Sequence, residues 1–482
     1  MLKSKLLDMM ILNEIIGIVG RDHTFTSASD RLSYSLDTYW APRALLDLGA
    51  EPDLPDVVVA PGSVEEVVEL IKLANIYRIP VIPFGGGSGS QGAILPVYGG
   101  MVIDLKRLKR IINIDEVSGT VTVQAGIVGY DLEAALNARG WTFPHYPASV
   151  HAATIGGSLA CRGSGTVSTK YGKAEDLVLS VEVVLPNGDV MRTLPVPNHA
   201  AGPGILQNFV GAEGIFGIVT EATLRITPLP QTRRFTAFLF PDLASGMEAG
   251  RRIMHADLRP CVMRLYDEVS TVKTVKNVLD LDVSKGAYLV IGFDGFEDIV
   301  DVCERRAIEI CREFSAAPLG AEAGMKWWDN RYNFYYPPKA LDVPWMFGTL
   351  DTVTTYNNIM KLYTNKRERL TQAFAEYDLY YYAHFSHWFP WGVMVYDRFV
   401  IEKPPQDKEE AIRLHDAVWN MSTAINLEFG GVLNEHHGVG LKLARHVRRQ
   451  YGAGFQVIEA IKDAVDPHHL MNPGKMGFGP TQ

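Results

Sequence analysis

Residues 83–92 read PFGGGSGSQG, and this glycine-dense loop constrains the fold more than any other feature of the chain. It follows residues 79–82, a short apolar run with the composition of a buried strand. Because glycine has no side chain, backbone N–H groups in such a loop can approach an anion closely. The loop is not a P-loop, since no lysine follows the glycines, and its spacing is not that of a Rossmann fingerprint. We interpret it as a pyrophosphate-binding loop, with a plain glycine-rich turn as the alternative.

Size and charge narrow the classes of protein to which the chain can belong. A length of 482 residues predicts two or three domains, and a net charge of −9 argues against nucleic acid as a partner. The four cysteines show no CxxC spacing, which argues against structural zinc or a disulfide framework and favours the cytoplasm. Residues 6–18 have the pattern of an amphipathic helix, and no apolar run is long enough to span a bilayer.

The elements around the glycine loop form a βαβ-like unit. Residues 56–60 predict a strand, and Ser63 with Glu66 predicts a capping box for a helix that ends at Tyr77. The strand at 79–82 then leads into the loop. Further along, the patterns predict strands at 101–105, 120–125 and 215–226, a hairpin over 180–193, and helices over 130–139 and 454–465.

The composition changes near Leu229, after which aromatic residues become dense. We therefore expect a domain boundary there, with a different, aromatic-rich domain after it. The predicted limits are 1–229, 230–429 and 430–482.

Five blocks in a fixed order carry a family resemblance: PFGGGSG, PASVHAATIGGSLACRGSG, GAEGIFGIVTEATLRITPLP, GGVLNEHHGVG and VDPHHLMNPGKMG. Together they resemble the vanillyl-alcohol-oxidase type of FAD-binding flavoproteins over nearly the whole chain. The resemblance implies an α+β fold, in which a PCMH-type FAD-binding domain, 1–229, carries an α+β cap or substrate domain, 230–429, with an antiparallel sheet flanked by helices. It also implies that residues 430–482 return to the FAD-binding domain.

Three branches of this family share features with the chain. The block HAATIGGSLACRGSG, Arg264, Tyr396 and the paired histidines of EHHGVG resemble the alkyldihydroxyacetonephosphate synthase branch, although Glu435 stands where that branch has a third histidine. The stretches SVEVVLPNGDVMRT and NPGKMG resemble aryl-alcohol and phenol oxidases. EHHGVG also resembles the EHGVG of D-2-hydroxyacid dehydrogenases, but residues 384–387 read HFSH and lack the HxGDGNxH of that branch.

The resemblance implies FAD as the cofactor and assigns its contacts to three parts of the chain. The implied contacts are Pro83, Phe84, Gly85, Gly86, Gly87, Ser88, Gly89, Pro147, Ala148, Ser149, Ala153, Gly157, Arg162, Ser164, Glu213, Gly214, Gly217, Ile218 and Val219. Many relatives tether FAD through a histidine in the first glycine loop, and this loop has none. We therefore predict FAD that is bound without a covalent bond.

Tyr396 is the expected proton-transfer residue. It lies on a strand-like run, residues 392–399, and the resemblance places it at the family's proton-transfer tyrosine. A phenol has a pKa of about 10, so it needs a nearby cation to act as a base, and Arg264, His436 and His437 can supply one. The alternative for Tyr396 is an ordinary core aromatic whose hydroxyl is hydrogen-bonded.

The paired histidines lie between glycines, in a loop. We expect the two side chains to point in different directions, so that one faces the flavin, and we expect no metal site there. Glu435 can orient one imidazole. Arg264 and Arg331 are candidates for holding an anionic group of the substrate, with an ion pair to Asp267 or Glu268 as the alternative for Arg264.

These features predict an FAD-dependent oxidoreductase, an oxidase or dehydrogenase, that takes a hydride from an alcohol or phenolic substrate. The aromatic-rich cap favours an aromatic or apolar small molecule. The alternatives are a redox-neutral transferase similar to alkyldihydroxyacetonephosphate synthase and a D-2-hydroxyacid dehydrogenase. A homodimer is possible for each of them.

Overall fold

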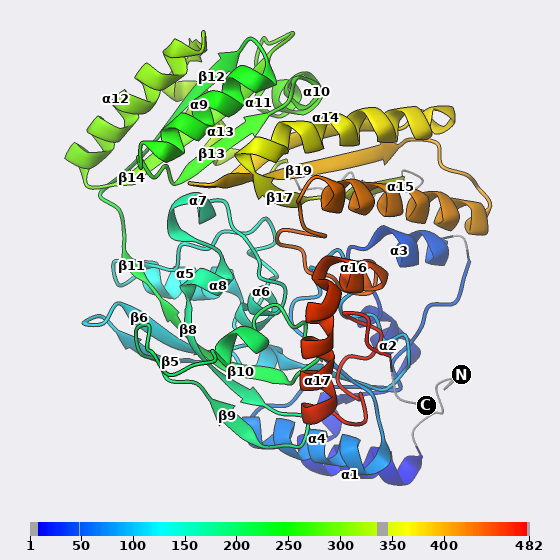
Figure 1. The fold of residues 1–482 in the computed structure, drawn as a ribbon. Helices are drawn as coiled ribbons and strands as arrows, with labels where there is room; N and C mark the ends of the chain where they lie inside the picture. The colour runs from blue at the N-terminus through cyan, green and yellow to red at the C-terminus, as the bar shows by residue number, and fades with distance from the viewer. Residues whose placement is uncertain (1–7, 48, 335–345, 480–482) are drawn as a thin grey trace. The chain divides into compact units, whose positions relative to one another are not determined.

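The computed structural model describes residues 8–47, 49–334 and 346–479, and the chain divides into two compact units (Figure 1). The first unit comprises residues 1–164, 173–228 and 436–482, and the second comprises residues 165–172 and 229–435. The excursion at 165–172 carries the short helix α7 (Ser168–Tyr171) into the second unit. The predicted domains 1–229, 230–429 and 430–482 stay a prediction.

A four-stranded sheet of the first unit delivers the glycine loop. Its strand order is β1-β2-β4-β3, with bounds β1 Thr24–Phe25, β2 Val57–Val59, β3 Val81–Phe84 and β4 Met101–Asp104. Strands β2, β3 and β4 are parallel, and buried side chains of α1 (Met9–Val19) and α4 (Val64–Tyr77) pack on them. The predicted helix ending at Tyr77 and the strands beside it are confirmed. The Ser63 hydroxyl accepts from Glu66 N–H at 3.2 Å, but the Glu66 carboxylate accepts from Gly62 N–H, so the predicted capping box is only half formed.

A five-stranded antiparallel sheet forms the rest of the first unit, in the order β5-β6-β10-β8-β9. Its bounds are β5 Ile111–Asp115, β6 Thr120–Gln124, β8 Val178–Val184, β9 Val190–Arg192 and β10 Ile218–Arg225. The predicted hairpin is the β8–β9 pair. A two-stranded ribbon accompanies it, β7 (Trp141–Thr142) with β11 (Thr227–Pro228). The helices of this unit not yet given are α2 Ala28–Ser33, α3 Trp40–Asp47, α5 Gly129–Asn137, α6 Ile155–Ala160, α8 Ala174–Leu177, α16 Val447–Tyr451 and α17 Phe455–Val465.

The second unit is built on an eight-stranded antiparallel sheet. Seven strands follow the order β15-β12-β14-β13-β18-β19-β16, and β17 pairs with β19. The bounds are β12 Thr232–Phe240, β13 Val262–Tyr266, β14 Ala287–Gly295, β15 Ala317–Leu319, β16 Met346–Thr349, β17 Thr352–Thr355, β18 Tyr380–Phe389 and β19 Gly392–Ile401. The predicted cap with an antiparallel sheet flanked by helices is thus confirmed (Figure 1).

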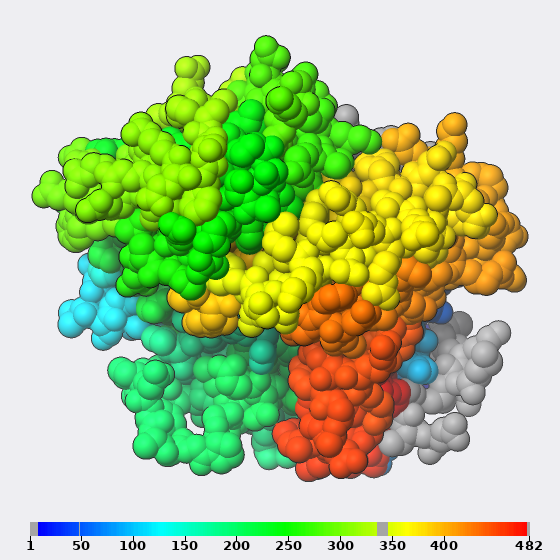
Figure 2. All heavy atoms as spheres, turned by 45° about the horizontal axis from the view of Figure 1, so that its top comes forward, coloured from blue at the N-terminus to red at the C-terminus, as the bar shows by residue number. Residues whose placement is uncertain are grey.

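Helices cover this sheet with their apolar faces. The helices are α9 Leu243–His255, α10 Glu268–Ser270, α11 Lys276–Leu279, α12 Glu297–Glu313, α13 Gly320–Asp329, α14 Tyr356–Ala373 and α15 Lys408–Glu428. On α14 the buried residues recur at helical spacing, from Ile359 through Leu362 to Leu370. Figure 2 shows α14 and α15, in yellow and orange, side by side on the surface of this unit. None of the described helices has the length and apolarity needed to cross a membrane.

One ion pair lies entirely inside the second unit. Lys366 Nζ is 2.7 Å from the Asp397 carboxylate, and both side chains are fully buried. Lys366 also donates to the Leu350 carbonyl, and the Tyr381 hydroxyl donates to Asp397. These hydrogen bonds compensate the cost of removing two charges from water.

Replacing Lys366 with methionine is therefore expected to destabilise the protein. The change leaves the Asp397 carboxylate buried without its cation, which costs about 3–5 kcal/mol in comparable cases. Urea unfolding followed by circular dichroism measures this difference. Lys361→Met, at an exposed position of the same helix, is the control and should cost about 0.5 kcal/mol or less. Equal unfolding midpoints for the two variants would refute the assigned role of the pair.

Candidate functional site

The glycine loop of the first unit presents backbone donors with no protein acceptor. Residues 86–89 follow β3, and none of their N–H groups donates to an acceptor in the described part of the chain. The loop is partly buried up to Ser88, and Gly87 has φ +61°, a value that favours glycine. Neighbouring unpaired amides in such a loop form an anion-binding concavity, so the loop fits the pyrophosphate of FAD.

A second predicted cofactor segment lies directly against this loop. A Cβ atom added to Gly86 would overlap the Ala152 carbonyl, and one added to Gly85 would overlap the Thr154 hydroxyl. Thr154 is also the N-cap of α6, since its hydroxyl accepts from Gly157 N–H at 3.2 Å. The missing side chains of the glycines therefore let two of the predicted FAD-binding segments meet.

Glu213 holds the C-terminal loop in place. Its side chain is buried, and its carboxylate accepts from Val439 N–H at 2.6 Å and from Gly440 N–H at 2.7 Å. Gly438 is required here because a Cβ atom would overlap the Glu213 carboxylate. From the sequence, Glu213 was predicted only as a cofactor contact. No local sequence pattern predicts its hydrogen bonds to Val439 and Gly440. Its proposed contact with FAD, like those of the other residues assigned to the cofactor, stays a prediction.

The charge state of Glu213 gives a prediction about stability and pH. Burial raises the pKa of the Glu213 carboxyl from 4.5 to about 7. The folded protein thus binds this proton more tightly than the unfolded chain, so the stabilising contribution is complete below pH 4.5 and is lost as the pH rises through about 7. Glu213→Gln, which keeps the acceptor oxygen, should flatten the fall in unfolding free energy across this range. Urea titrations at several pH values measure it, and parallel profiles for variant and wild type would contradict the assignment.

Two other cofactor candidates use their side chains within the protein. Arg162 has φ +54°, and its Nε donates to the Val210 carbonyl and lies 3.0 Å from the Glu175 carboxylate. Ser164 is buried at the end of the first segment of this unit. The Arg162 contacts tie its side chain to other parts of the first unit.

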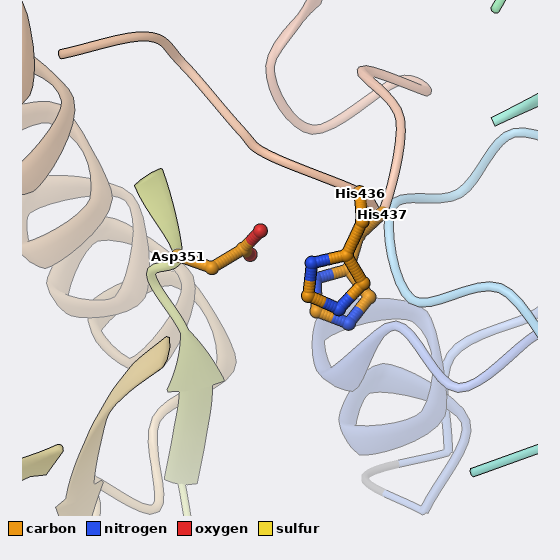
Figure 3. Close-up of side chains that lie close together, drawn as sticks. All are labelled: Asp351, His436 and His437. Atoms are coloured by element: carbon orange, nitrogen blue, oxygen red, sulfur yellow. The ribbon is translucent and has the colours of Figure 1, made fainter. Parts of the chain in front are cut away.

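The paired histidines lie together, against the expectation that they would diverge. The ring centroids of His436 and His437 are 3.9 Å apart with the ring planes tilted by 39° (Figure 3). The expectation assumed the alternation of an extended strand, whereas the chain bends at residues 435–437. Both imidazoles are partly exposed on the first unit, so both are available for proton transfer.

Glu435 ends the second unit and orients a histidine, although not one of the pair. Its carboxylate lies 3.0 Å from His387 Nδ1, and both side chains are buried. Its N–H donates to Asp351, the carboxylate drawn in Figure 3, which also accepts from the Asn434 side chain. Glu435 is therefore held from both its backbone and its side chain.

A pocket on the second unit is lined by two of the four predicted catalytic residues, Arg264 and Tyr396. The pocket is small and partly open to solvent. The lining residues are Arg264, Tyr266, Ser270, Thr274, Phe334, Tyr382, His384, Tyr396 and Arg398. Two guanidinium groups, three phenols and an imidazole thus face one small volume, together with the ring of Phe334.

Tyr396 is in contact with two potentially charged side chains of this pocket. It pairs across the sheet with His384, whose ring stacks on it at 4.7 Å and 18°. Arg398 Nη2 donates to the Tyr396 hydroxyl at 3.3 Å. Arg264 lies on β13, is buried, and stacks over Trp327 at 5.3 Å. The structure therefore gives Tyr396 the cationic neighbour that a basic phenol needs.

The pocket also shows what sequence reasoning missed. Arg398 was not proposed. It is two residues from Tyr396 on the same strand, and strand alternation predicts from the sequence that the two side chains share one face. His384 was not proposed as a site residue, yet it lines the pocket. Arg331 is not among the lining residues, because its guanidinium stacks on Trp328 and Tyr332 and donates to the Trp328 carbonyl. Its substrate-binding role stays a prediction.

Comparisons with known proteins match the chain along nearly its whole length. Residues 55–194 match a family described as FAD binding domain, and residues 229–476 match one described as FAD linked oxidases, C-terminal domain.

Curated relatives are similar over most of their own length as well. The alkyldihydroxyacetonephosphate synthase of Dictyostelium discoideum is 30% identical over 89% of this chain and 74% of its own. That of Trypanosoma brucei brucei is 28% identical over 96% and 80%. The glycolate oxidase subunit GlcD of Bacillus subtilis is 27% identical over 97% and 96%.

Solved structures extend the similarity to three dimensions. A structure of alkyldihydroxyacetonephosphate synthase aligns with a TM-score of 0.81 at 26% identity, covering 97% of this chain and 85% of the other. p-Cresol methylhydroxylase with substrate bound aligns with a TM-score of 0.78 at 19% identity, covering 98% and 96%, which is a likeness of fold alone.

Proposed function

We propose, because this chain belongs to the family of FAD-linked oxidases, that it is an oxidoreductase removing two hydrogens from an alcohol or phenolic substrate. The cofactor is FAD, and the fold is the expected PCMH-type FAD-binding fold. The observation that carries the proposal is the Tyr396 hydroxyl, which shares a pocket with Arg264 and accepts a hydrogen bond from Arg398.

The proposed roles follow from the chemistry of each side chain. When bound, FAD supplies the acceptor for a hydride from the substrate carbon. The Tyr396 oxygen takes the proton of the substrate hydroxyl, and the Arg264 guanidinium holds an anionic oxygen of the substrate. Residues 86–89 hold the FAD pyrophosphate through their free N–H groups. His436 and His437 are proposed as further proton-transfer groups.

The test of this proposal is a mass balance. One equivalent of substrate, added without oxygen, should bleach one equivalent of flavin and give a product that is two hydrogens poorer. A turnover in which the product has the same oxidation state as the substrate would exclude the oxidoreductase.

Arg264→Lys tests the anion-binding role. Lysine keeps the charge but loses the planar, two-pronged donor geometry, so we expect KM to rise by roughly 10-fold or more with a smaller change in kcat. Steady-state kinetics with and without the anionic group on the substrate measures the effect. An unchanged KM would show that Arg264 serves the fold through its contact with Trp327.

FAD is proposed to be bound without a covalent link, since the first glycine loop contains no histidine. Acid precipitation should then release all the yellow flavin into the supernatant. Colour that stays with the denatured chain would contradict this. A homodimer and a cytoplasmic location also stay predictions, and the mass in solution would test the first.

A synthase similar to alkyldihydroxyacetonephosphate synthase is the second candidate. The relatives and the solved structure of that name, at 26–30% identity over most of both chains, favour it. Against it, Glu435 stands where that branch has a histidine, and its carboxylate is committed to His387. Formation of an alkyl product from acyl-dihydroxyacetone phosphate and a fatty alcohol, with no net flavin reduction, would establish it. A D-2-hydroxyacid dehydrogenase is a third candidate, favoured by the likeness to the glycolate oxidase subunit.

A further inference from the structure

Arg398 lies beside the proposed base. Both Arg398 and Tyr396 are on β19, two residues apart, so their side chains share one face of the sheet and line the same pocket. Arg398 Nη2 is 3.3 Å from the Tyr396 oxygen, and its guanidinium carbon lies 5.1 Å from the centre of the ring. A guanidinium can only donate hydrogen bonds, so the tyrosine oxygen is the acceptor in this contact. The proton of the tyrosine hydroxyl therefore points away from Arg398.

We propose that Arg398 is a positioning residue that stabilises the phenolate form of Tyr396 and thereby prepares it to accept the substrate proton. The inference rests on the proposed role of Tyr396 as the base. A fixed positive charge at this distance favours the charged form of a phenol, and a neutral hydrogen bond alone would do so less.

Other polar groups face Tyr396 from the neighbouring strands. On β18, His384 stacks on its ring, and Tyr382 lies opposite Arg398 in the sheet. On β13, Arg264 and Tyr266 line the same pocket. The residues paired with this part of β19 on its other side, Thr349 of β16 and Thr352 of β17, do not titrate.

The buried pair of Lys366 and Asp397 belongs to the opposite face of β19, because Asp397 lies between Tyr396 and Arg398 on an alternating strand. Arg264 adds to the positive field of the pocket, and Arg398 makes a direct contact with the hydroxyl. Removing Arg398 should accordingly raise the pKa of Tyr396 by roughly 1–3 units. Arg398→Lys should restore most of the shift, since it keeps the charge.

The experiment needs a readout that does not depend on turnover. The near-ultraviolet absorbance of ionised tyrosine is followed against pH in the FAD-loaded protein, and the titration of Tyr396→Phe is subtracted to isolate Tyr396. Arg398→Gln should move this titration to higher pH by roughly 1–3 units, and the pH profile of flavin reduction should move with it. Arg367→Gln is the matched control, because Arg367 makes the same kind of contact with the Tyr363 hydroxyl, at 3.4 Å, outside the pocket lining.

The outcomes separate this inference from the function on which it rests. Equal titrations of Tyr396 in Arg398→Gln and in the wild type would overturn the inference, even if Tyr396→Phe slows flavin reduction. An equal shift in Arg367→Gln would also overturn it, because the effect would then be a general change of charge. The inference would be supported if the titration of Tyr396 moves to higher pH in Arg398→Gln and stays near the wild-type position in Arg398→Lys. This holds whether or not Arg398→Gln is less stable. Failure of the proposed function would give a different result: Tyr396→Phe would reduce the flavin at the wild-type rate.

Discussion

Tyr396→Phe is expected to keep FAD bound and to slow the reduction of the flavin by substrate about 10²–10⁴-fold. The change removes only the hydroxyl oxygen that is proposed to take the substrate proton. The ring keeps its stacking partner, His384, so the pocket should keep its shape. Stopped-flow absorbance without oxygen measures the rate, and the visible spectrum before mixing shows whether FAD is present.

Tyr380→Phe is the matched control for this experiment. Tyr380 lies on β18, carries Lys273 over its ring, and is not among the residues that line the pocket. Its removal should leave the rate of flavin reduction within about 3-fold of the wild type, since it touches none of the reacting groups. If both variants reduce the flavin at the wild-type rate, Tyr396 has no part in the reaction.

Gly86→Ala should strongly weaken FAD binding. The new methyl group would overlap the Ala152 carbonyl, which is backbone and cannot move aside without displacing the turn that caps α6. The loop would have to shift, and the free N–H groups of residues 86–89 would lose their common direction. We expect purified protein with little flavin and an affinity for added FAD that is about 100-fold or more weaker, a loss of two charge-assisted hydrogen bonds. Flavin fluorescence titration measures it.

Gly89→Ala separates this effect from a general intolerance of the loop. A methyl group at Gly89 approaches only the Asp37 carboxylate, at an ordinary contact distance of 3.7 Å. The variant should fold and keep most of its FAD. Full flavin content in Gly86→Ala would show that the contact between the two segments is not needed for binding.

Local elements of the fold were predictable because short-range signals determine them. The helix ending at Tyr77 has an N-cap serine and a regular apolar spacing, and it forms where those signals predict. The hairpin of β8 and β9 follows from the Pro-Asn-Gly turn. The position of Tyr396 on a strand follows from alternation along residues 392–399.

Contacts between distant parts of the chain could not be read from one sequence. Glu213 binds the amides of residues 439–440, and no local pattern connects these positions. No local pattern connects Glu435 with His387 either. Nor does one predict that residues 165–172 join the second unit, where Lys170 and Tyr171 bind the Asp294 carboxylate.

The site itself was predicted in part. Arg264 and Tyr396 both line one pocket, and their proposed roles stay predictions. Arg398 was missed, although strand alternation places it on the same face as Tyr396. The family resemblance assigns it no role. The prediction that the side chains of His436 and His437 point in different directions was wrong, because it assumed an extended backbone where the chain bends.

The most direct test of the proposed function is the visible spectrum of the FAD-loaded protein, recorded without oxygen on addition of phenols, alcohols, hydroxyacids and acyl-dihydroxyacetone phosphate in turn. The account predicts that an alcohol or a phenol bleaches the flavin, that Tyr396→Phe bleaches far more slowly, and that air or an artificial acceptor restores the colour. A spectral change with the acyl phosphate alone, together with formation of an alkyl product, would contradict the account and identify a synthase.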